Sequence, residues 1–216
     1  MNTEQPLPAV QQALIPIAAF AATGELPRLN AALRRGLDAG LTISQTRETL
    51  VQMYAYAGFP RSLNALGELM KVLAERKQQG IDDVAGTEPG PTPTGAELLA
   101  TGTANQTELS GAPVKGPLFD FAPAIDFYLK AHLFGDIFSR TNLDWRSREL
   151  ATVSALAAMT GTEPQLLAHI RISMNVGLSE PQLRQAAAIL DKDVNAAAGQ
   201  RANAALDRQQ ADTKPH

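Results

Sequence analysis

Signals that start and stop helices are the feature of this sequence that most limits its fold. Thr42 and Ser179 are each followed three residues later by glutamine, which is the spacing of a capping box. Gly40 ends the helical segment before Thr42, because glycine adopts the left-handed conformation of a helix end without steric cost. The alternation of apolar and polar residues that is typical of strands is nearly absent. The sequence therefore predicts an all-α protein.

The expected helices form two groups, residues 8–77 and 118–208, on either side of a connector. They are expected near Val10–Ala22, Pro27–Ala39, Thr42–Gly58 and Pro60–Lys77, and then at Pro123–Arg140, Asp144–Met159, Thr162–Val176 and from Ser179 onwards. Pro16 predicts a kink or a late start in the first helix, because proline lacks the donor N–H. Asp144 and Thr162 are expected to cap their helices, and the polar residues 209–216 are expected to fray.

The connector, residues 78–117, is rich in Gly, Pro and Thr and has little apolar periodicity. A short helix is expected near Ala96–Ala100. Connectors of this length in compact domains are usually functional or wrap around a partner subunit.

The two groups of helices share a pattern that predicts a repeat. An ungapped alignment of residues 29–50 with residues 166–187 pairs Leu29 with Leu166, Ala31 with Ala168, Arg34 with Arg171, Gly40 with Gly177, Leu41 with Leu178, Gln45 with Gln182 and Arg47 with Arg184. The alternative is that two unrelated helical hairpins look alike because both obey the capping rules. His169 falls opposite Ala32, so the imidazole belongs to the second group alone.

Composition excludes several classes of function. The net charge of -3 and the pI near 5.6 argue against a nucleic-acid or membrane-surface partner. A chain without cysteine has no disulfide, thiolate metal site or thiol nucleophile. The N-terminal MNTEQPLPAVQQ lacks the basic start of a secretory signal, so we expect a cytoplasmic protein, or a periplasmic one if a signal peptide was removed. The histidines and carboxylates show no metal-ligand spacing, so no metal is expected.

Glu149 and His169 are the first candidate site, because they place an acid and an imidazole in an apolar, alanine-rich stretch. They lie 12 residues before and 8 residues after Gly161. At about 1.5 Å per residue they stand roughly 18 and 12 Å from the turn of a helical hairpin. A contact between them, direct or through a water molecule, is therefore allowed. The alternative is a solvated charge at a helix start and a partly buried packing residue.

Further candidates lie on the neighbouring helices. His132, Asp136 and Arg140 are spaced i, i+4 and i+8 and so share one helix face. That face either lines a pocket or is solvated and joined by an Asp136–Arg140 ion pair. Arg61 and Asn64 lie in the first turn of a helix, where anions are favoured; the alternative is an ordinary exposed helix start.

Two segments carry a family resemblance. The first is HLFGDIFSRTNLDWRSRELATVSALAAMTGTEPQLLAHIRISMNVGLSEPQL, and the second is GLT-x(5)-E-x(5)-YAYAGFPRSLNAL at residues 40–66. Together they resemble the carboxymuconolactone decarboxylase family over most of residues 10–206, with the connector outside the match. Tyr54 and Tyr56 of the second segment point in different directions on a helix. We therefore expect at most one of them to enter a given pocket, and packing is the alternative role for both.

The resemblance implies an all-α fold of two alkylhydroperoxidase D-like helical repeats joined by a long Pro/Gly-rich connector. It also implies a homo-oligomer, a trimer or hexamer. One branch of the family, similar to alkylhydroperoxidase D, uses a CxxC pair with a glutamate and a histidine. Here the two cysteine positions fall at Thr162 and Gln165, while Glu149 and His169 match the glutamate and the histidine. A thiol peroxidase is therefore excluded on this chain, because neither threonine nor glutamine supplies a thiolate.

The other branch decarboxylates 4-carboxymuconolactone without a cofactor. The resemblance then implies that His169 transfers a proton, that Glu149 orients the imidazole, and that Arg140 or His132 contacts the carboxylate. The substrate class is a small lactone or carboxylic acid, with Arg61, Asn64 and Tyr54 as further candidates for binding it. A lactone isomerase or hydrolase uses the same pair.

An oligomeric scaffold without activity is an alternative of a different class. The Y-A-G-F-P element occurs only in the first repeat and the histidine only in the second. Either the two repeats combine into one site, or the protein has drifted to another substrate.

Overall fold

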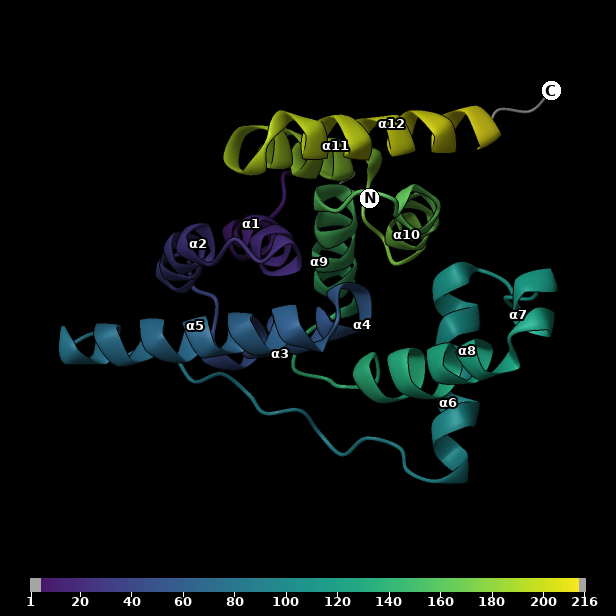
Figure 1. Cartoon of the computed structure of the whole chain (residues 1–216), viewed down its shortest axis with the longest axis horizontal. Helices are drawn as coiled ribbons and strands as arrows, with labels where there is room; N and C mark the ends of the chain where they lie inside the picture. The colour runs from purple at the N-terminus through teal and green to yellow at the C-terminus, as the bar shows by residue number, and fades with distance from the viewer. Residues whose placement is uncertain (1–4, 214–216) are drawn as a thin grey trace.

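Helices make up every regular element in residues 5–213, the part of the chain that the computed structural model describes (Figure 1). The first group contains α1 (Ala9–Thr23), α2 (Leu26–Asp38), α3 (Ile43–Gln52), α4 (Tyr54–Ala57) and α5 (Phe59–Gln78). After the connector follow α6 (Ala96–Ser110), α7 (Pro117–Phe121), α8 (Pro123–Tyr128), the π-helix η1 (Leu129–Ile137), α9 (Trp145–Ala158), α10 (Glu163–Asn175), α11 (Glu180–Ile189), the π-helix η2 (Leu190–Val194) and α12 (Ala196–Thr213). The prediction of an all-α fold is confirmed.

The order of helices in the first group recurs in the second. Adding 137 to the bounds of α2, 26 and 38, gives the bounds of α10, 163 and 175, and the same shift takes α3 onto α11. Both capping boxes form, at Thr42 with Gln45 and at Ser179 with Gln182. Gly40 and Gly177 each have a positive φ, 99° and 95°, just before these caps, as expected for a glycine that ends a helix.

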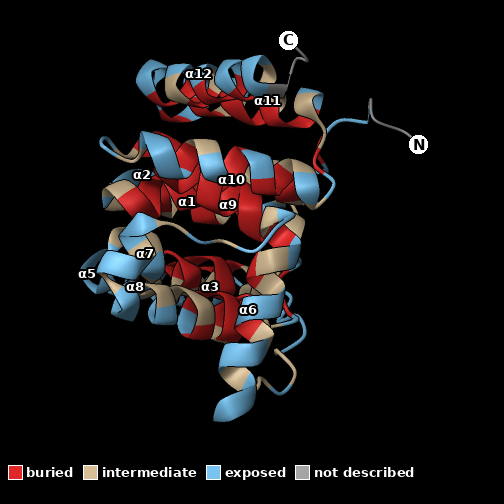
Figure 2. Ribbon diagram, turned by 90° about the vertical axis from the view of Figure 1, so that its right-hand side faces the viewer, coloured by how far each residue is buried: buried red, intermediate tan, exposed pale blue. Residues whose placement is uncertain are grey.

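The corresponding helices α1 and α9 pack against each other at the centre of the molecule. In Figure 2 most of both helices is buried. The alanines at 18, 19, 21 and 22 in α1, and at 151, 155 and 157 in α9, let the two backbones approach closely. One face of this pair is covered by α11 and α12 and another by α3 and α5 (Figure 1). Pro16 lies inside α1 and is buried, and the helix starts at Ala9 without the delay that the proline predicted.

The structure differs from the sequence-based expectation along the segment from α6 to η1. The short helix expected near Ala96–Ala100 is α6, which continues to Ser110. It is long because it packs on η1, where a Cβ on Gly102 would lie 1.7 Å from the carbonyl oxygen of Lys130. The helix expected to reach Arg140 ends at Ile137 and has π geometry in its second half.

Arg140 therefore does not share a helix face with His132 and Asp136, and this prediction was wrong. Its Nε donates to both carboxylate oxygens of Glu48, each at 2.9 Å. Asp136 instead pairs with Nδ1 of His132 at 3.2 Å. The Asp136–Arg140 ion pair is accordingly absent from the described residues.

Two helix ends also differ from their predictions. Thr162 does not cap α10 through its side chain, because its hydroxyl donates to the carbonyl of Leu156 at 2.8 Å. Helix α12 continues to Thr213, beyond the start of the tail expected to fray, and Arg171 of α10 contacts Gln209 and Asp212 there. In the first group, the helix expected to run to Gly58 is interrupted at Met53, between α3 and α4.

The first part of the connector is hydrogen-bonded to the start of helix α3. The backbone N–H groups of Ile43 and Ser44 donate to the carbonyls of Val84 and Ala85, each at 2.9 Å. These N–H groups belong to the first turn of α3 and have no partner within the helix. Nearby, the buried Arg76 forms a bidentate ion pair with Asp83. The first part of the connector therefore stabilises the start of α3.

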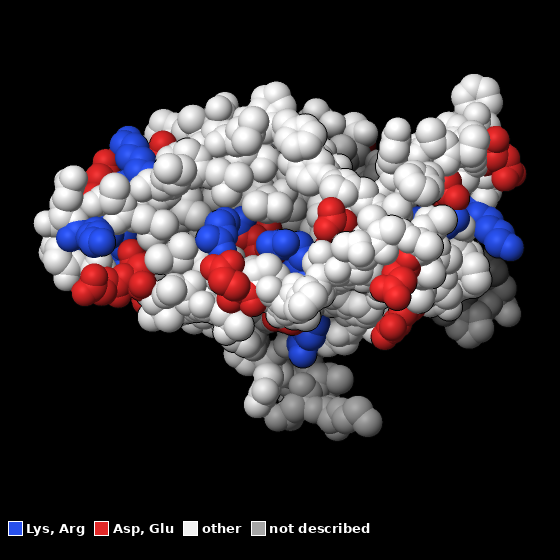
Figure 3. All heavy atoms as spheres, turned by 90° about the horizontal axis from the view of Figure 1, so that it is seen from below, with Lys and Arg blue, Asp and Glu red and all other residues white. Residues whose placement is uncertain are grey.

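Charged side chains of both signs are interspersed on the face drawn in Figure 3. That face shows no continuous basic surface of the kind that phosphate backbones require. Within residues 5–213, no helix is both long enough and apolar enough to cross a bilayer.

Candidate functional site

Glu149 and His169 are in direct contact in the interior of the protein. Helix α9 carries Glu149 and α10 carries His169, and the two helices form the hairpin expected around Gly161. Nδ1 of His169 lies 2.8 Å from Oε2 of Glu149, and the two side chains are 10% and 0% exposed. Glu149 is therefore not a solvated charge. Its second oxygen, Oε1, is also buried and has no hydrogen-bond partner within the described residues, which leaves one acceptor position of the carboxylate open.

Tyr56 of α4 brings a residue of the first group to this pair. Its ring meets the imidazole of His169 edge to face, with 5.5 Å between the ring centroids. Burial raises the pKa of the Tyr56 phenol far above its ordinary value, and the negative charge of Glu149 raises it further, while Thr152 and Arg148 act in the opposite direction. Tyr56 therefore remains a neutral phenol beside the carboxylate and the imidazole.

The raised pKa of Tyr56 predicts a specific loss of stability in alkali. The folded state disfavours the phenolate, so stability is unaffected below the ordinary tyrosine pKa of about 10 and falls as the pH rises above it. We expect this residue to cost about 1.4 kcal/mol per pH unit above that point. Urea unfolding of the wild type and of Tyr56→Phe between pH 8 and pH 11 measures the difference, with about 10 as the pH at which the curves begin to separate. Parallel curves would show that Tyr56 ionises freely in the folded protein.

Tyr54 lies two residues before Tyr56 and contacts the other histidine of this region. Its ring is 5.4 Å from the imidazole of His132 and stacks on Phe59 at 4.4 Å. Both tyrosines pack against the small core formed by η1, α6 and α10. Tyr54 and Tyr56 thus meet two different histidines, in agreement with their different directions on the helix.

Arg148 of α9 directly precedes Glu149 in the sequence. It forms a buried ion pair with Glu48 of α3. Nη2 of Arg148 donates to Oε1 of Glu48 at 2.9 Å, and the two side chains are 0% and 1% exposed. The remaining donors of Arg148 reach Gln52 and the carbonyls of Leu143 and Arg140. Burial lowers the pKa of Arg148 and the Glu48 charge raises it. Sequence reasoning did not single out Glu48 or Arg148, although both lie in the quoted segments, at the glutamate after GLT and in RSREL.

The site therefore combines residues of both groups. Tyr56 and Glu48 come from the first group, whereas Glu149, His169 and Arg148 come from the second. This arrangement explains the uneven distribution of motifs along the chain. The first group carries the segment with the tyrosine, the second carries the pair, and the fold brings them together.

Within the described residues, the remaining candidates form no hydrogen bond or ion pair with Glu149 or His169. Arg61 donates to the carbonyl of Ala22 at 2.6 Å, at the end of α1. Asn64 is exposed on α5, and no hydrogen bond in the described chain joins it to another candidate. Arg140 is 30% exposed and bound to Glu48. His132 is half-exposed beside Tyr54.

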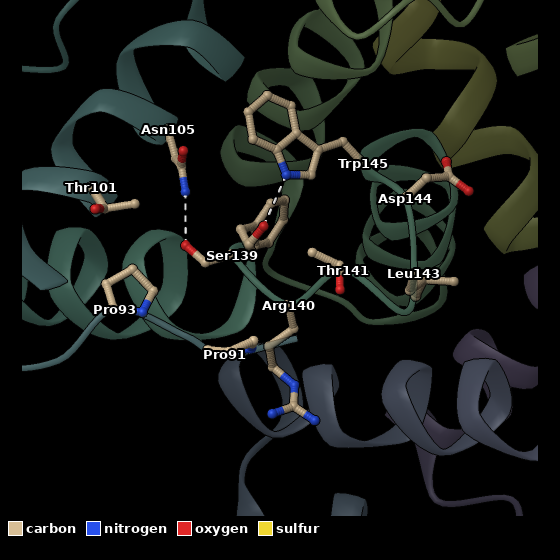
Figure 4. A pocket seen from close by; sticks show the side chains of 11 residues that line it. Pro91, Pro93, Thr101, Asn105, Ser139, Arg140, Thr141, Leu143, Asp144 and Trp145 are labelled. Atoms are coloured by element: carbon tan, nitrogen blue, oxygen red, sulfur yellow. Dashed lines mark hydrogen bonds between the residues drawn. The ribbon is translucent and has the colours of Figure 1, made fainter. Parts of the chain in front are cut away.

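A hollow of about 550 Å³ lies between the connector, α6 and the start of α9. Figure 4 shows Asn105 and Trp145 on one side of it and Pro91 and Pro93 on the other, with Nε1 of Trp145 donating to the carbonyl of Phe138 at 2.9 Å. Arg140 is at its edge, and its guanidinium points away from Trp145 (Figure 4). Neither Glu149 nor His169 lines this hollow.

The fold and the site define an all-α protein with a buried carboxylate–imidazole pair where its two groups of helices meet. The sequence pattern of the Carboxymuconolactone decarboxylase family matches residues 1–70 and 123–208, more than half of the chain, and omits the connector. The chain therefore belongs to the carboxymuconolactone decarboxylase family. Comparison with curated proteins gave no match.

Proposed function

We propose that this protein is an enzyme that transfers protons, without a cofactor, in the decarboxylation or isomerisation of a small lactone or carboxylic acid. The observation that carries the proposal is the buried 2.8 Å contact between Nδ1 of His169 and Oε2 of Glu149. A carboxylate that holds one imidazole nitrogen fixes the orientation of the ring and leaves the other nitrogen, Nε2, for proton transfer. Family membership supports the same class of reaction.

Each group has a defined task in the decarboxylation that we propose. When carbon dioxide leaves, the electron pair of the broken bond stays on the substrate as an enolate. Nε2 of the protonated His169 gives a proton to the enolate carbon, and the ring then takes up a proton from the solvent, so that each turnover releases one carbon dioxide and consumes one proton. The carboxylate of Glu149 accepts from Nδ1 of the ring and holds its orientation. Tyr56 packs against the imidazole edge to face and limits its rotation.

The substrate carboxylate requires a donor near this pair. Nε of Arg140 is bound to both oxygens of the buried Glu48, whereas His132 is engaged through Nδ1 alone, by the half-exposed Asp136. Arg140 is therefore the weaker of the two candidates. His132 is half-exposed, and it contacts Tyr54, which lies two residues before Tyr56, the residue that contacts His169. We therefore assign the carboxylate contact to His132, with Tyr54 beside it.

Incubation of the protein with 4-carboxymuconolactone and with a series of small lactone acids tests the proposal. Released carbon dioxide identifies a decarboxylase, and a change in the lactone NMR spectrum without gas release identifies an isomerase. No conversion of any compound in the series would favour a second candidate, an oligomeric scaffold that has lost its activity. The near-complete burial of Glu149 and His169 is the observation that favours that candidate.

We also propose that copies of the chain associate through the segment from α7 to α8. Five large apolar side chains of this segment are exposed, and Phe121 is 88% exposed. They are Leu118, Phe121, Ile125, Phe127 and Tyr128. Apolar surface of this density within twelve residues is unusual on a monomer and marks interaction sites.

Light scattering after size exclusion tests this association. The wild type is expected to have three or six times the chain mass of 23.0 kDa, and Phe121→Asp/Phe127→Asp is expected to have the mass of one chain, because the charges are costly to bury. Met70→Asp is the matched control, since Met70 is exposed to a similar degree on α5. A monomeric wild type, or an unchanged mass in the double variant, would contradict the proposal.

A further inference from the structure

A hollow of about 230 Å³ lies between α1, α2 and η2, in the part of the molecule that corresponds to the candidate site. Gln12, Ala32 and Asp193 are among the residues that line it. Adding 137 to residue numbers 12 and 32 gives 149 and 169, and adding 137 to 56 gives 193. The same shift relates α2 to α10 and α3 to α11. The three positions are therefore the counterparts of Glu149, His169 and Tyr56.

The side chains at these positions explain why the space is open. In the candidate site the imidazole of His169 and the phenol of Tyr56 occupy the corresponding positions, with their ring centroids 5.5 Å apart. In the hollow, a methyl group at Ala32 and a short carboxylate at Asp193 replace the two rings. The missing rings leave a space of a size that suits a single ring.

The walls and the rim of the hollow have different chemistry. Ala13, Pro16, Ala32 and Ile189 make the wall apolar. Gln12, Arg35 and Asp193 supply its polar groups, and Arg35 and Asp193 also border a neighbouring hollow that contains Arg28 and Lys192. An apolar wall with a few polar groups at its edge is typical of small-molecule sites.

The charge at the rim favours an anion. Arg28 is already held by Glu25 at 3.0 Å and by the carbonyls of Asp193 and Val194. The side chains of Arg35 and Lys192 form no ion pair or hydrogen bond within residues 5–213, and both are exposed. Asp193 is the one carboxylate among the residues that line the two hollows, and it forms no ion pair within residues 5–213. Lys192 borders only the neighbouring hollow, so the unpaired cations outnumber the unpaired carboxylates by one over the two adjoining hollows together. The planar fork of an arginine suits a carboxylate.

We propose that this hollow binds a small cyclic carboxylate, with the ring against the alanines of α1 and α2 and the carboxylate on Arg35. The ligand is not transformed there, because the hollow has neither the imidazole nor the paired glutamate. The proposal concerns binding alone, so it stands or falls independently of turnover at His169.

Titration of the isotopically labelled full chain with benzoate, followed by amide NMR, tests the proposal. Benzoate combines one six-membered ring with one carboxylate. We expect saturable shifts at the amides of Ala13, Ala32 and Arg35. In Arg35→Gln the affinity is expected to fall by about tenfold or more, because a charge-assisted contact is lost. Arg208→Gln, an exposed arginine on α12, removes the same charge away from the hollow and is expected to leave the affinity unchanged.

Two further comparisons separate the hollow from other sources of binding. Benzyl alcohol has the same ring without the charge and is expected to give no saturable shift. Ala32→His restores the imidazole at the corresponding position and is expected to abolish benzoate binding by filling the space, while Arg35→Gln provides a test that does not alter a buried residue. Equal binding of benzoate and benzyl alcohol, undiminished affinity in Arg35→Gln, or shifts confined to the surroundings of His169 would each overturn the proposal.

Discussion

Replacing Glu48 with alanine is expected to lower the free energy of unfolding by about 3–5 kcal/mol, the range typical of a buried ion pair that loses one partner. The loss is large because Arg148 remains in place, 0% exposed, without the carboxylate that compensates its charge. Asn142 and Arg140 also lose the oxygens to which they donate. Urea denaturation followed by circular dichroism measures the change.

Two further variants serve as matched controls for Glu48→Ala. Glu88→Ala removes a carboxylate from the exposed pair with Arg47 and is expected to cost less than about 1 kcal/mol. Glu48→Met/Arg148→Met removes both buried charges and fills the space with apolar atoms, so it is expected to recover most of the stability lost in Glu48→Ala. If Glu48→Ala were no more costly than Glu88→Ala, the ion pair would not be holding α3 against α9.

Replacing His169 with asparagine is expected to reduce turnover of the substrate found in the lactone series by about 10²–10⁴-fold, the usual contribution of general acid–base catalysis. Asparagine keeps an N–H donor close to the position of Nδ1, so Glu149 retains its partner. It has no group that exchanges a proton near neutral pH. Steady-state kinetics measures the loss, and thermal unfolding shows that the folded state persists.

His132→Asn is the matched control for this experiment. It makes the same substitution at a half-exposed histidine that we assign to substrate binding, so it is expected to raise KM more than it lowers kcat. Full activity in His169→Asn would remove His169 from the mechanism. An equal loss of kcat in the two variants would show that the histidines do not have separate roles.

The local features of this fold follow from the sequence because they depend on residues close together in the chain. Both capping boxes join residues three positions apart, and both formed as predicted. The contact between Glu149 and His169 could also be anticipated from the sequence, because the turn at Gly161 places the two residues at similar heights on one hairpin. The sequence left the rotation of the two helices open, and the packing of α9 against α1 decided it.

Features that depend on distant segments were decided by the tertiary structure alone. Glu48 and Arg148 are 100 residues apart and belong to different groups of helices, so no local pattern reveals that they pair. The direction of the Arg140 side chain depends on the end of the π-helix η1 at Ile137 and on the ion pair with Glu48 of α3. By itself the sequence determined the helical class, the helix starts and the presence of an acid and an imidazole in an apolar stretch. Only the packing of the two groups placed Tyr56 on His169 and left the corresponding position open at Ala32, because side chains far apart in the chain fill the same space.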